Sequence, residues 1–167
     1  KRNKNVCPHL HIPLQSGSNR VLAAMNRRYT VEDYLERIDF IRHRLNNPSF
    51  TTDVLIGFPG ETEQDFRDTA KACQSAGFSK IHIFSFSPRP GTSAAGMTNK
   101  VREGIVKERF YQMEKVAQGL ALDYKKQFIS KKVQVLVETG SEGFTELYQK
   151  VRFSGQPEGS PADRGLK

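Results

Sequence analysis

The stretch FTTDVLIGFPGET, residues 50–62, decides the fold, because both a strand and the start of a helix can be recognised in it. Its first eight residues are mostly β-branched or apolar, which is typical of a buried strand. Gly57 and Gly60 permit tight turns, and Thr62 can then cap a helix that Gly77 ends. The stretch therefore predicts a strand–turn–helix unit.

Similar units lie on both sides of this stretch. HLHIPL at 9–14 precedes a short helix that Ser18 can cap and a longer one that Thr30 can cap. KIHIFSF at 80–86 precedes a long amphipathic helix. The helical repeats are carried by Val31, Tyr34, Leu35, Ile38, Ile41 and Leu45, by Phe66, Ala70 and Cys73, and by Val106, Phe110, Met113, Ala117, Leu120, Tyr124 and Phe128. Strands that alternate with helices predict an α/β fold with parallel strands, either an open sheet or part of a barrel, and ligands at the carboxyl ends of the strands.

The pattern changes near residue 130. KVQVLVE at 132–138 and FTELYQKVRF at 144–153 alternate with a period of two around the turn-prone TGSEG, which predicts an antiparallel hairpin. We therefore expect one domain over 1–129 and the start of another over 130–167. The last residues, SGQPEGSPADRGLK, are rich in glycine, proline and serine and are expected to be disordered or a truncated continuation.

Composition excludes several classes of protein. The chain has 167 residues, 26 basic and 18 acidic side chains and a net charge of +8, which suits a polyanionic partner such as RNA. Its two cysteines, Cys7 and Cys73, form neither a disulfide framework nor a zinc motif, so a reducing cytoplasmic setting is expected. No apolar run approaches the roughly 18 residues that a membrane span needs.

Polar side chains stand where such a sheet binds ligands. Asp53 is a carboxylate among apolar neighbours, so it needs donors from ligand hydroxyls, an arginine or the backbone. Arg27, near the same end of the sheet, can grip a carboxylate with two parallel hydrogen bonds, although a solvated surface arginine is the commoner case. The glycines of GFPGET lead into a helix N-terminus that attracts negative charge, so this segment is either a phosphate site or a plain turn.

Two other chemistries are weaker. His9 and His11 alternate on a strand and share a face, but no further ligand stands at a recognised metal spacing, which favours histidines of the core or next to a ligand-binding residue. QSGS at 15–18 lacks the Gly-x-Ser-x-Gly pattern, so Ser16 is not expected to be a hydrolase nucleophile.

Three strings resemble consecutive blocks of the radical S-adenosylmethionine (SAM) methylthiotransferases, which modify tRNA or ribosomal protein. They are CPHLHIPLQSGSNRVLAAMNRRYT (7–30), TTDVLIGFPGETEQDF (51–66) and HIFSFSPRPGTSAAGM (82–97). QSGS favours the tRNA enzymes, and GFTELYQKVRF resembles the start of a TRAM domain, a small RNA-binding β-barrel. HLHIPLQSGS, TTDVLIGFPGET and GFTELYQKV look most like the branch that acts on N6-threonylcarbamoyladenosine at position 37 of tRNA. The alternative branch acts on isopentenyl-adenosine at that position.

The resemblance implies roles for particular residues. Gln15 and Asp53 are similar to positions that hold the ribose of SAM, and Arg27 to the one that pairs with its methionyl carboxylate. An amide and a carboxylate suit vicinal hydroxyls, and a guanidinium suits a carboxylate. Residues 83–87 would border the adenine. The residues that the resemblance implies for cofactor binding are Gln15, Ser16, Arg27, Asp53, Gly57, Phe84 and Ser85.

Basic side chains near the C-terminal end are expected to contact tRNA. They are Lys125, Lys126, Lys131, Lys132, Lys150 and Arg152.

The chain departs from the family in one respect. The family holds a [4Fe–4S] cluster on Cys-x-x-x-Cys-x-x-Cys and a second one on an N-terminal domain, and both cysteine sets are missing here. We therefore expect the second half of a six-strand barrel followed by an incomplete TRAM-like domain, inactive alone and prone to self-association through an exposed edge. A non-catalytic RNA-binding module and an α/β-barrel enzyme for phosphorylated substrates are the rivals.

Overall fold

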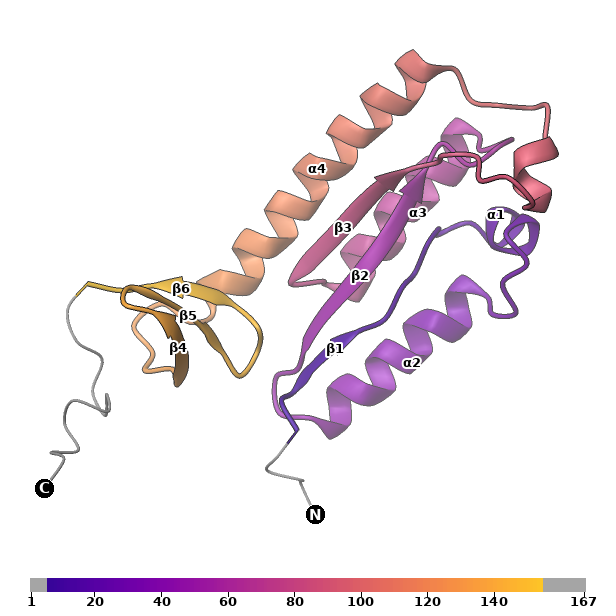
Figure 1. Cartoon of the computed structure of the whole chain (residues 1–167). Helices are drawn as coiled ribbons and strands as arrows, with labels where there is room; N and C mark the ends of the chain where they lie inside the picture. Colours follow the sequence, from indigo (N-terminus) through magenta and orange to yellow (C-terminus); the bar gives the residue numbers. More distant parts are fainter. Residues whose placement is uncertain (1–5, 155–167) are drawn as a thin grey trace, which may run out of the picture.

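A computed structural model of the chain describes residues 6–154, which form a three-stranded parallel sheet with helices and a small antiparallel sheet (Figure 1). The parallel strands are β1 (His9–His11), β2 (Ser49–Ile56) and β3 (Lys80–Ser85), with β2 in the centre. The predicted α/β fold with parallel strands is confirmed. The described part of the chain has no helix long and apolar enough to cross a bilayer.

Residues 6–154 form four α-helices, of which those after Ser18, Thr30 and Thr62 begin where the sequence predicts. They are α1 (Asn19–Ala24), α2 (Val31–Arg44), α3 (Glu63–Ala76) and α4 (Glu103–Lys126). Thr30 and Thr62 each accept a hydrogen bond from the backbone N–H three residues on, within a complete capping box. Gly77 ends α3 in the left-handed conformation that glycine adopts without steric cost. A 3₁₀ turn, η1 (Ser93–Gly96), lies between β3 and α4.

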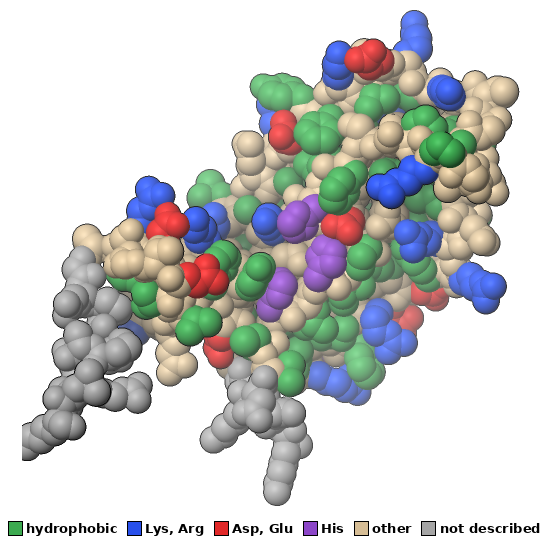
Figure 2. All heavy atoms as spheres, viewed as in Figure 1, with side chains coloured by type: hydrophobic (Ala, Val, Ile, Leu, Met, Phe, Trp, Pro, Cys, Tyr) green, Lys and Arg blue, Asp and Glu red, His purple; other side chains and the backbone are tan. Residues whose placement is uncertain are grey.

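The central strand β2 separates two unlike faces of the sheet. Phe50, Val54 and Ile56 point to the helix-covered face, where each is at most 1% exposed within the hydrophobic core. This core also contains side chains of all four helices, among them Leu22, Tyr34, Ile38, Phe66, Cys73 and Met113. We call the opposite side the open face and define it by His9, His11, Thr51, Asp53 and His82. Histidine side chains gather there in Figure 2.

The strand β1 is shorter than the predicted HLHIPL run, because its regular backbone pairing with β2 stops after Ile12, whose N–H donates to the Thr51 carbonyl at 2.9 Å. The Thr52 side chain takes over part of that ladder: its hydroxyl accepts from the Leu14 N–H at 2.8 Å and donates to the Ile12 carbonyl at 2.8 Å. Pairing resumes at Gln15, which bridges to Val54. The first strand therefore reaches the carboxyl end of the sheet despite its proline.

The small sheet has three strands, so the predicted hairpin was incomplete. They are β4 (Val135–Thr139), β5 (Glu142–Thr145) and β6 (Lys150–Arg152), in antiparallel order. FTELYQKVRF, expected as one strand, divides at a turn where the Thr145 hydroxyl accepts from the N–H groups of Leu147 and Gln149. Local alternation does not reveal such a side-chain-stabilised turn.

The domain boundary near residue 130 stays a prediction, although the architecture does change between α4 and β4. Figure 1 shows the small sheet beside the end of α4, near the end of the parallel sheet where β1 and β2 begin. His9 stacks on Tyr148 with ring centroids 4.9 Å apart and so joins the two sheets. The disorder expected for SGQPEGSPADRGLK concerns 154–167, of which 155–167 lie outside the described residues.

Candidate functional site

Gln15 stands at the carboxyl end of the parallel sheet in a strained conformation. Its φ of 65° is uncommon for a residue with a side chain. Its N–H donates to the Asp53 carbonyl at 2.8 Å, and its carbonyl accepts from the Leu55 N–H at 2.8 Å. These two bonds fix the Gln15 backbone beside Asp53, so the two residues predicted to share a ligand are neighbours in the structure. Backbone strain of this kind is concentrated at ligand sites in proteins.

Asp53 lies on the open face between two histidines. It pairs in register with His82 on β3, and its Oδ2 lies 3.3 Å from His11 Nε2 on β1. The Asp53 side chain is 25% exposed. The partner of the carboxylate is therefore an imidazole, whereas the sequence suggested an arginine, the backbone or a ligand.

Two of the three histidines of the open face, His9 and His11, are joined by one hydroxyl group. Thr51 Oγ1 lies 3.2 Å from His9 Nε2 and 3.0 Å from His11 Nδ1. Burial lowers the pKa of His9, and the neighbouring His11 lowers it further. Burial, with the Lys80 charge, also lowers the pKa of His82 against the opposing effect of Asp53. Both groups are therefore mainly neutral near pH 7, and residues 6–154 contain no group of three side chains placed to hold a metal ion.

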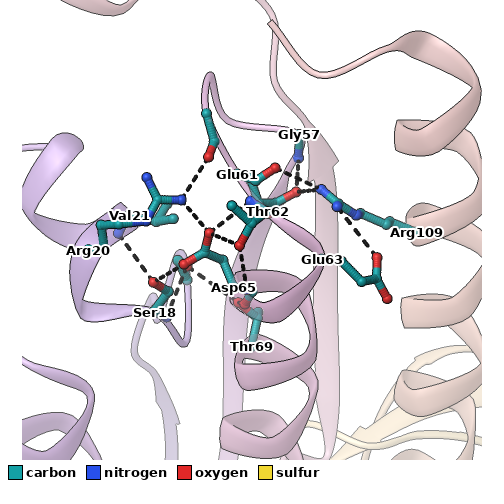
Figure 3. A network of polar contacts seen from close by, with 12 residues as sticks. Ser18, Arg20, Val21, Gly57, Glu61, Thr62, Glu63, Asp65, Thr69 and Arg109 are labelled. Atoms are coloured by element: carbon teal, nitrogen blue, oxygen red, sulfur yellow. Dashed lines mark hydrogen bonds and ion pairs between the residues drawn. The ribbon is translucent and has the colours of Figure 1, made fainter. Parts of the chain in front are cut away.

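The GFPGET loop is held by its own carboxylate. Glu61 is buried, and its Oε2 accepts from the Gly57 N–H at 3.0 Å and from Arg109 at 2.8 Å (Figure 3). Burial raises the pKa of Glu61, and the hydrogen bonds from Gly57 and Arg109 oppose that rise. A Cβ on Gly57 would lie 2.7 Å from Val106, so α4 packs directly on this glycine. The Gly57 N–H that a ligand could have used is occupied by Glu61.

Asp65 fills the N-terminus of α3 in the same way. Its carboxylate accepts from the Thr62 N–H at 2.7 Å, from the Ser18 hydroxyl at 2.6 Å and from the Arg20 guanidinium (Figure 3). Burial tends to raise the pKa of Asp65, but the hydrogen bonds from Arg20, Ser18 and Thr62 outweigh it and lower the pKa well below its usual range. An internal anion therefore occupies the helix terminus, which argues against the phosphate-site interpretation of GFPGET.

The remaining residues predicted to bind a cofactor differ in their accessibility. Ser16 is fully buried and bonds to Thr69 and the Ser18 N–H, so this placement gives its predicted role no support. Phe84 is 51% exposed, and Ser85 is exposed at the end of β3.

Arg27 is exposed just after α1. Its charge acts on Tyr29, whose hydroxyl donates to the Leu14 carbonyl at 3.1 Å. Arg27 is therefore near the end of the first strand, as the sequence predicted.

A basic groove lies at the other end of the sheet. It has a volume of about 420 Å³ and is lined by the loop before β2, the end of α4 and the small sheet. Four of the six basic residues predicted to contact RNA line it: Lys125, Lys131, Lys132 and Lys150. Lys126 and Arg152 are outside the lining and form ion pairs with Asp123 and Glu142. We call this feature the lysine groove.

The residues present fit SAM better than they fit an iron–sulfur cluster. An amide, a carboxylate and a guanidinium near one strand end match the hydroxyls and the carboxylate of SAM. Cys7 is exposed and Cys73 is buried, with a thiol pKa that burial raises to about 12. These two cysteines provide no set of thiolate ligands for a cluster.

Comparisons with known proteins show which family the chain is similar to. A model of the radical SAM superfamily matches residues 1–73. The chain is 42% identical over 160 residues to the threonylcarbamoyladenosine tRNA methylthiotransferase MtaB of Thermotoga maritima, covering 93% of this chain and 37% of that protein. It is 41% identical over 157 residues to the tRNA-2-methylthio-N(6)-dimethylallyladenosine synthase of Alkaliphilus oremlandii, covering 90% of this chain and 33% of that protein.

One solved structure shares the fold. Coproporphyrinogen III oxidase from Escherichia coli, a radical SAM enzyme, superposes with a TM-score of 0.54 at 17% sequence identity, over 72% of this chain and 26% of that one. The chain belongs to the radical SAM superfamily. Within it, the chain is a homologue of the tRNA methylthiotransferases, and it spans 37% and 33% of the length of the two relatives named above.

Proposed function

We infer that the carboxyl end of the open face binds SAM and that the whole protein transfers a methylthio group to tRNA. The observation that carries the proposal is the backbone hydrogen bond from the Gln15 N–H to the Asp53 carbonyl, which makes a residue with an amide and a residue with a carboxylate neighbours toward the carboxyl end of the sheet, where ligands bind on parallel sheets. In this proposal Gln15 and Asp53 receive the two ribose hydroxyls, and Arg27 pairs with the methionyl carboxylate.

Other residues of the chain have supporting roles in this proposal. Phe84 and Ser85 border the adenine at the exposed end of β3. Glu61 and Arg109 hold the Gly57 turn, so that the end of β2 keeps its shape. SAM and the [4Fe–4S] clusters, when bound, supply the radical chemistry and the methyl group. The residues described here bind and orient SAM and do not hold a cluster.

The second part of the proposal concerns the RNA. The names of the relatives include tRNA, and the lysine groove offers four ammonium groups that can contact phosphates, of which Lys150 also lies 2.7 Å from Glu142 Oε2. Asn46 and Asn47, which precede β2, line the groove, so it lies at the end of the sheet opposite Gln15. We therefore place the reacting adenosine at the Gln15 end and another part of the same tRNA at the lysine groove.

We propose N6-threonylcarbamoyladenosine at position 37 as the modified nucleoside, with C2 of the base as the position that receives the methylthio group. The support is the combination of HLHIPLQSGS, TTDVLIGFPGET and GFTELYQKV. The two named relatives act on different adenosines and are almost equally similar, so their identities do not separate the branches. Isopentenyl-adenosine is the alternative substrate.

The decisive experiment is mass spectrometry of tRNA nucleosides from cells without the gene. We expect the methylthio group to disappear from threonylcarbamoyladenosine while other methylthio nucleosides persist. Its loss from isopentenyl-adenosine would transfer the assignment to the alternative branch. An unchanged nucleoside profile would overturn the enzymatic proposal and favour a non-catalytic RNA-binding protein, for which the lysine groove is the supporting feature.

A further inference from the structure

His11 has two neighbours that account for both of its ring nitrogens. Its Nε2 lies 3.3 Å from Asp53 Oδ2, and its Nδ1 lies 3.0 Å from Thr51 Oγ1. With its proton on Nε2, the His11 ring turns an N–H toward the Asp53 carboxylate and leaves Nδ1 to accept from the Thr51 hydroxyl. The Thr51 oxygen can then accept from His9 Nε2, 3.2 Å away. Each donor in this chain therefore faces an acceptor.

The contact with His11 involves only one of the two oxygens of the Asp53 carboxylate. Asp53 Oδ1 has no hydrogen-bond partner among the residues that the structure describes, and the side chain is partly exposed on the open face. His82, the register partner of Asp53, meets His11 edge-on at 5.7 Å between ring centroids and forms no hydrogen bond with the carboxylate within residues 6–154. Asp53 thus has one oxygen held by the protein and one free for a ligand.

We propose that His11 is a positioning residue, which holds the Asp53 carboxylate in the orientation that receives the ribose hydroxyls of SAM. The inference rests on the proposed function, because it takes the ribose role of Asp53 from there. Thr51 fixes the imidazole, and the imidazole fixes the carboxylate, so less side-chain freedom is lost when the ligand binds. The effect of losing one such restraint is about threefold to tenfold in affinity.

The test compares two substitutions of His11 by isothermal titration calorimetry on the whole protein. His11→Leu removes both ring nitrogens, whereas His11→Gln keeps an amide N–H that can reach Asp53. We expect His11→Leu to weaken SAM binding about threefold to tenfold and His11→Gln to stay within about twofold of the wild type. His82→Leu is the matched control, because it removes an imidazole on the other side of Asp53, and it should also stay within about twofold.

A second ligand distinguishes a positioning role of His11 from a general loss of structure at the site. With the 2',3'-dideoxyribose analogue of SAM, His11→Leu and the wild type should bind equally, because the hydroxyls that Asp53 receives are missing. Equal weakening of both ligands would show a merely structural role for His11 and overturn the inference, as would wild-type affinity of His11→Leu for SAM. If the wild-type protein binds no SAM, the proposed function fails and the inference fails with it.

Discussion

The two faces of the parallel sheet differ in what their side chains do. On the helix-covered face, Phe50, Val54 and Ile56 are almost completely buried in one apolar core. On the open face, the same strand presents Thr51, which is hydrogen-bonded to His11, and Asp53, whose carboxylate lies 3.3 Å from the His11 ring. Because side chains alternate along a strand, one sequence supplies both faces. The comparison indicates that the covered face carries the stability of the protein, and it supports the proposal that the open face binds the ligand.

A large loss of stability should come from breaking the buried ion pair beside the covered face. Arg109→Leu leaves the Glu61 carboxylate buried without its cation, so we expect the free energy of unfolding to fall by about 3–5 kcal/mol. Lys107→Ala, on the same helix, removes an exposed partner of Glu103 and should leave that free energy unchanged. Urea unfolding of both variants measures the difference. Equal stability of the two variants would contradict a structural role for Glu61 and Arg109.

Replacing one phenylalanine on each side of the sheet shows how much each side contributes to the free energy of unfolding. Phe50→Ala opens a cavity in the core and should lower the free energy of unfolding by about 3–5 kcal/mol. Phe84, which is 51% exposed, loses little burial when replaced by alanine, so its effect should be below about 1 kcal/mol. Chemical denaturation again provides the measurement. A large loss in Phe84→Ala would show that the region around it carries stability as well.

The lowered pKa of Asp65 makes the stability of the fold depend on pH, with a sign that can be predicted. Its pKa in the folded protein is lower than in the unfolded chain, so the ionised carboxylate stabilises the fold above the unfolded pKa, and this contribution is lost as the pH falls below about 4. Asp65→Asn should therefore cost about 1–2 kcal/mol at pH 7, when the cap of α3 is weakened. The difference in the free energy of unfolding between the wild type and Asp65→Asn should become smaller below pH 4. A gap that stays constant down to pH 2 would refute the assignment.

The lysine groove should affect RNA binding without affecting stability. Lys131→Glu with Lys132→Glu reverses two charges that line the groove, so affinity for tRNA should fall at least about tenfold at low salt, with a shallower salt dependence. Lys71→Glu with Lys115→Glu makes the same charge change on the outer surfaces of α3 and α4 and serves as the control. Filter binding across salt concentrations tests both. The groove is not an RNA contact if the two double variants bind equally.

The sequence predicted those features that depend on local signals. Thr30, Thr62 and Gly77 act within one turn of their helices, so the helix ends were predictable. The bond between Arg109 and Glu61 and the contact between His11 and Asp53 join residues far apart in the chain. Their pairing depends on strand register and helix packing, which no local pattern contains.

The same distinction explains the errors and omissions at the site. The cofactor contact expected of Ser16 stays a prediction, and the contact of its hydroxyl with Thr69 depends on how α3 packs, which no local pattern contains. The alternation in FTELYQKVRF looked continuous, but a turn at Tyr148 interrupts it. The Thr145 hydroxyl stabilises this turn by accepting from the N–H groups of Leu147 and Gln149. His11 carried a usable signal, since it alternates with His9 on the strand that ends at Gln15, but its partner Asp53 became evident only from the register.

The central claim, that the open face of this sheet binds SAM through Asp53, is tested most directly by one calorimetric titration. The whole wild-type protein and its Asp53→Asn variant are titrated with SAM, and their thermal unfolding is compared as a check on folding. We predict that Asp53→Asn binds SAM at least about tenfold more weakly, at unchanged unfolding temperature, because the carboxylate that receives the ribose hydroxyls is lost. Equal affinity of the two proteins for SAM would contradict the claim.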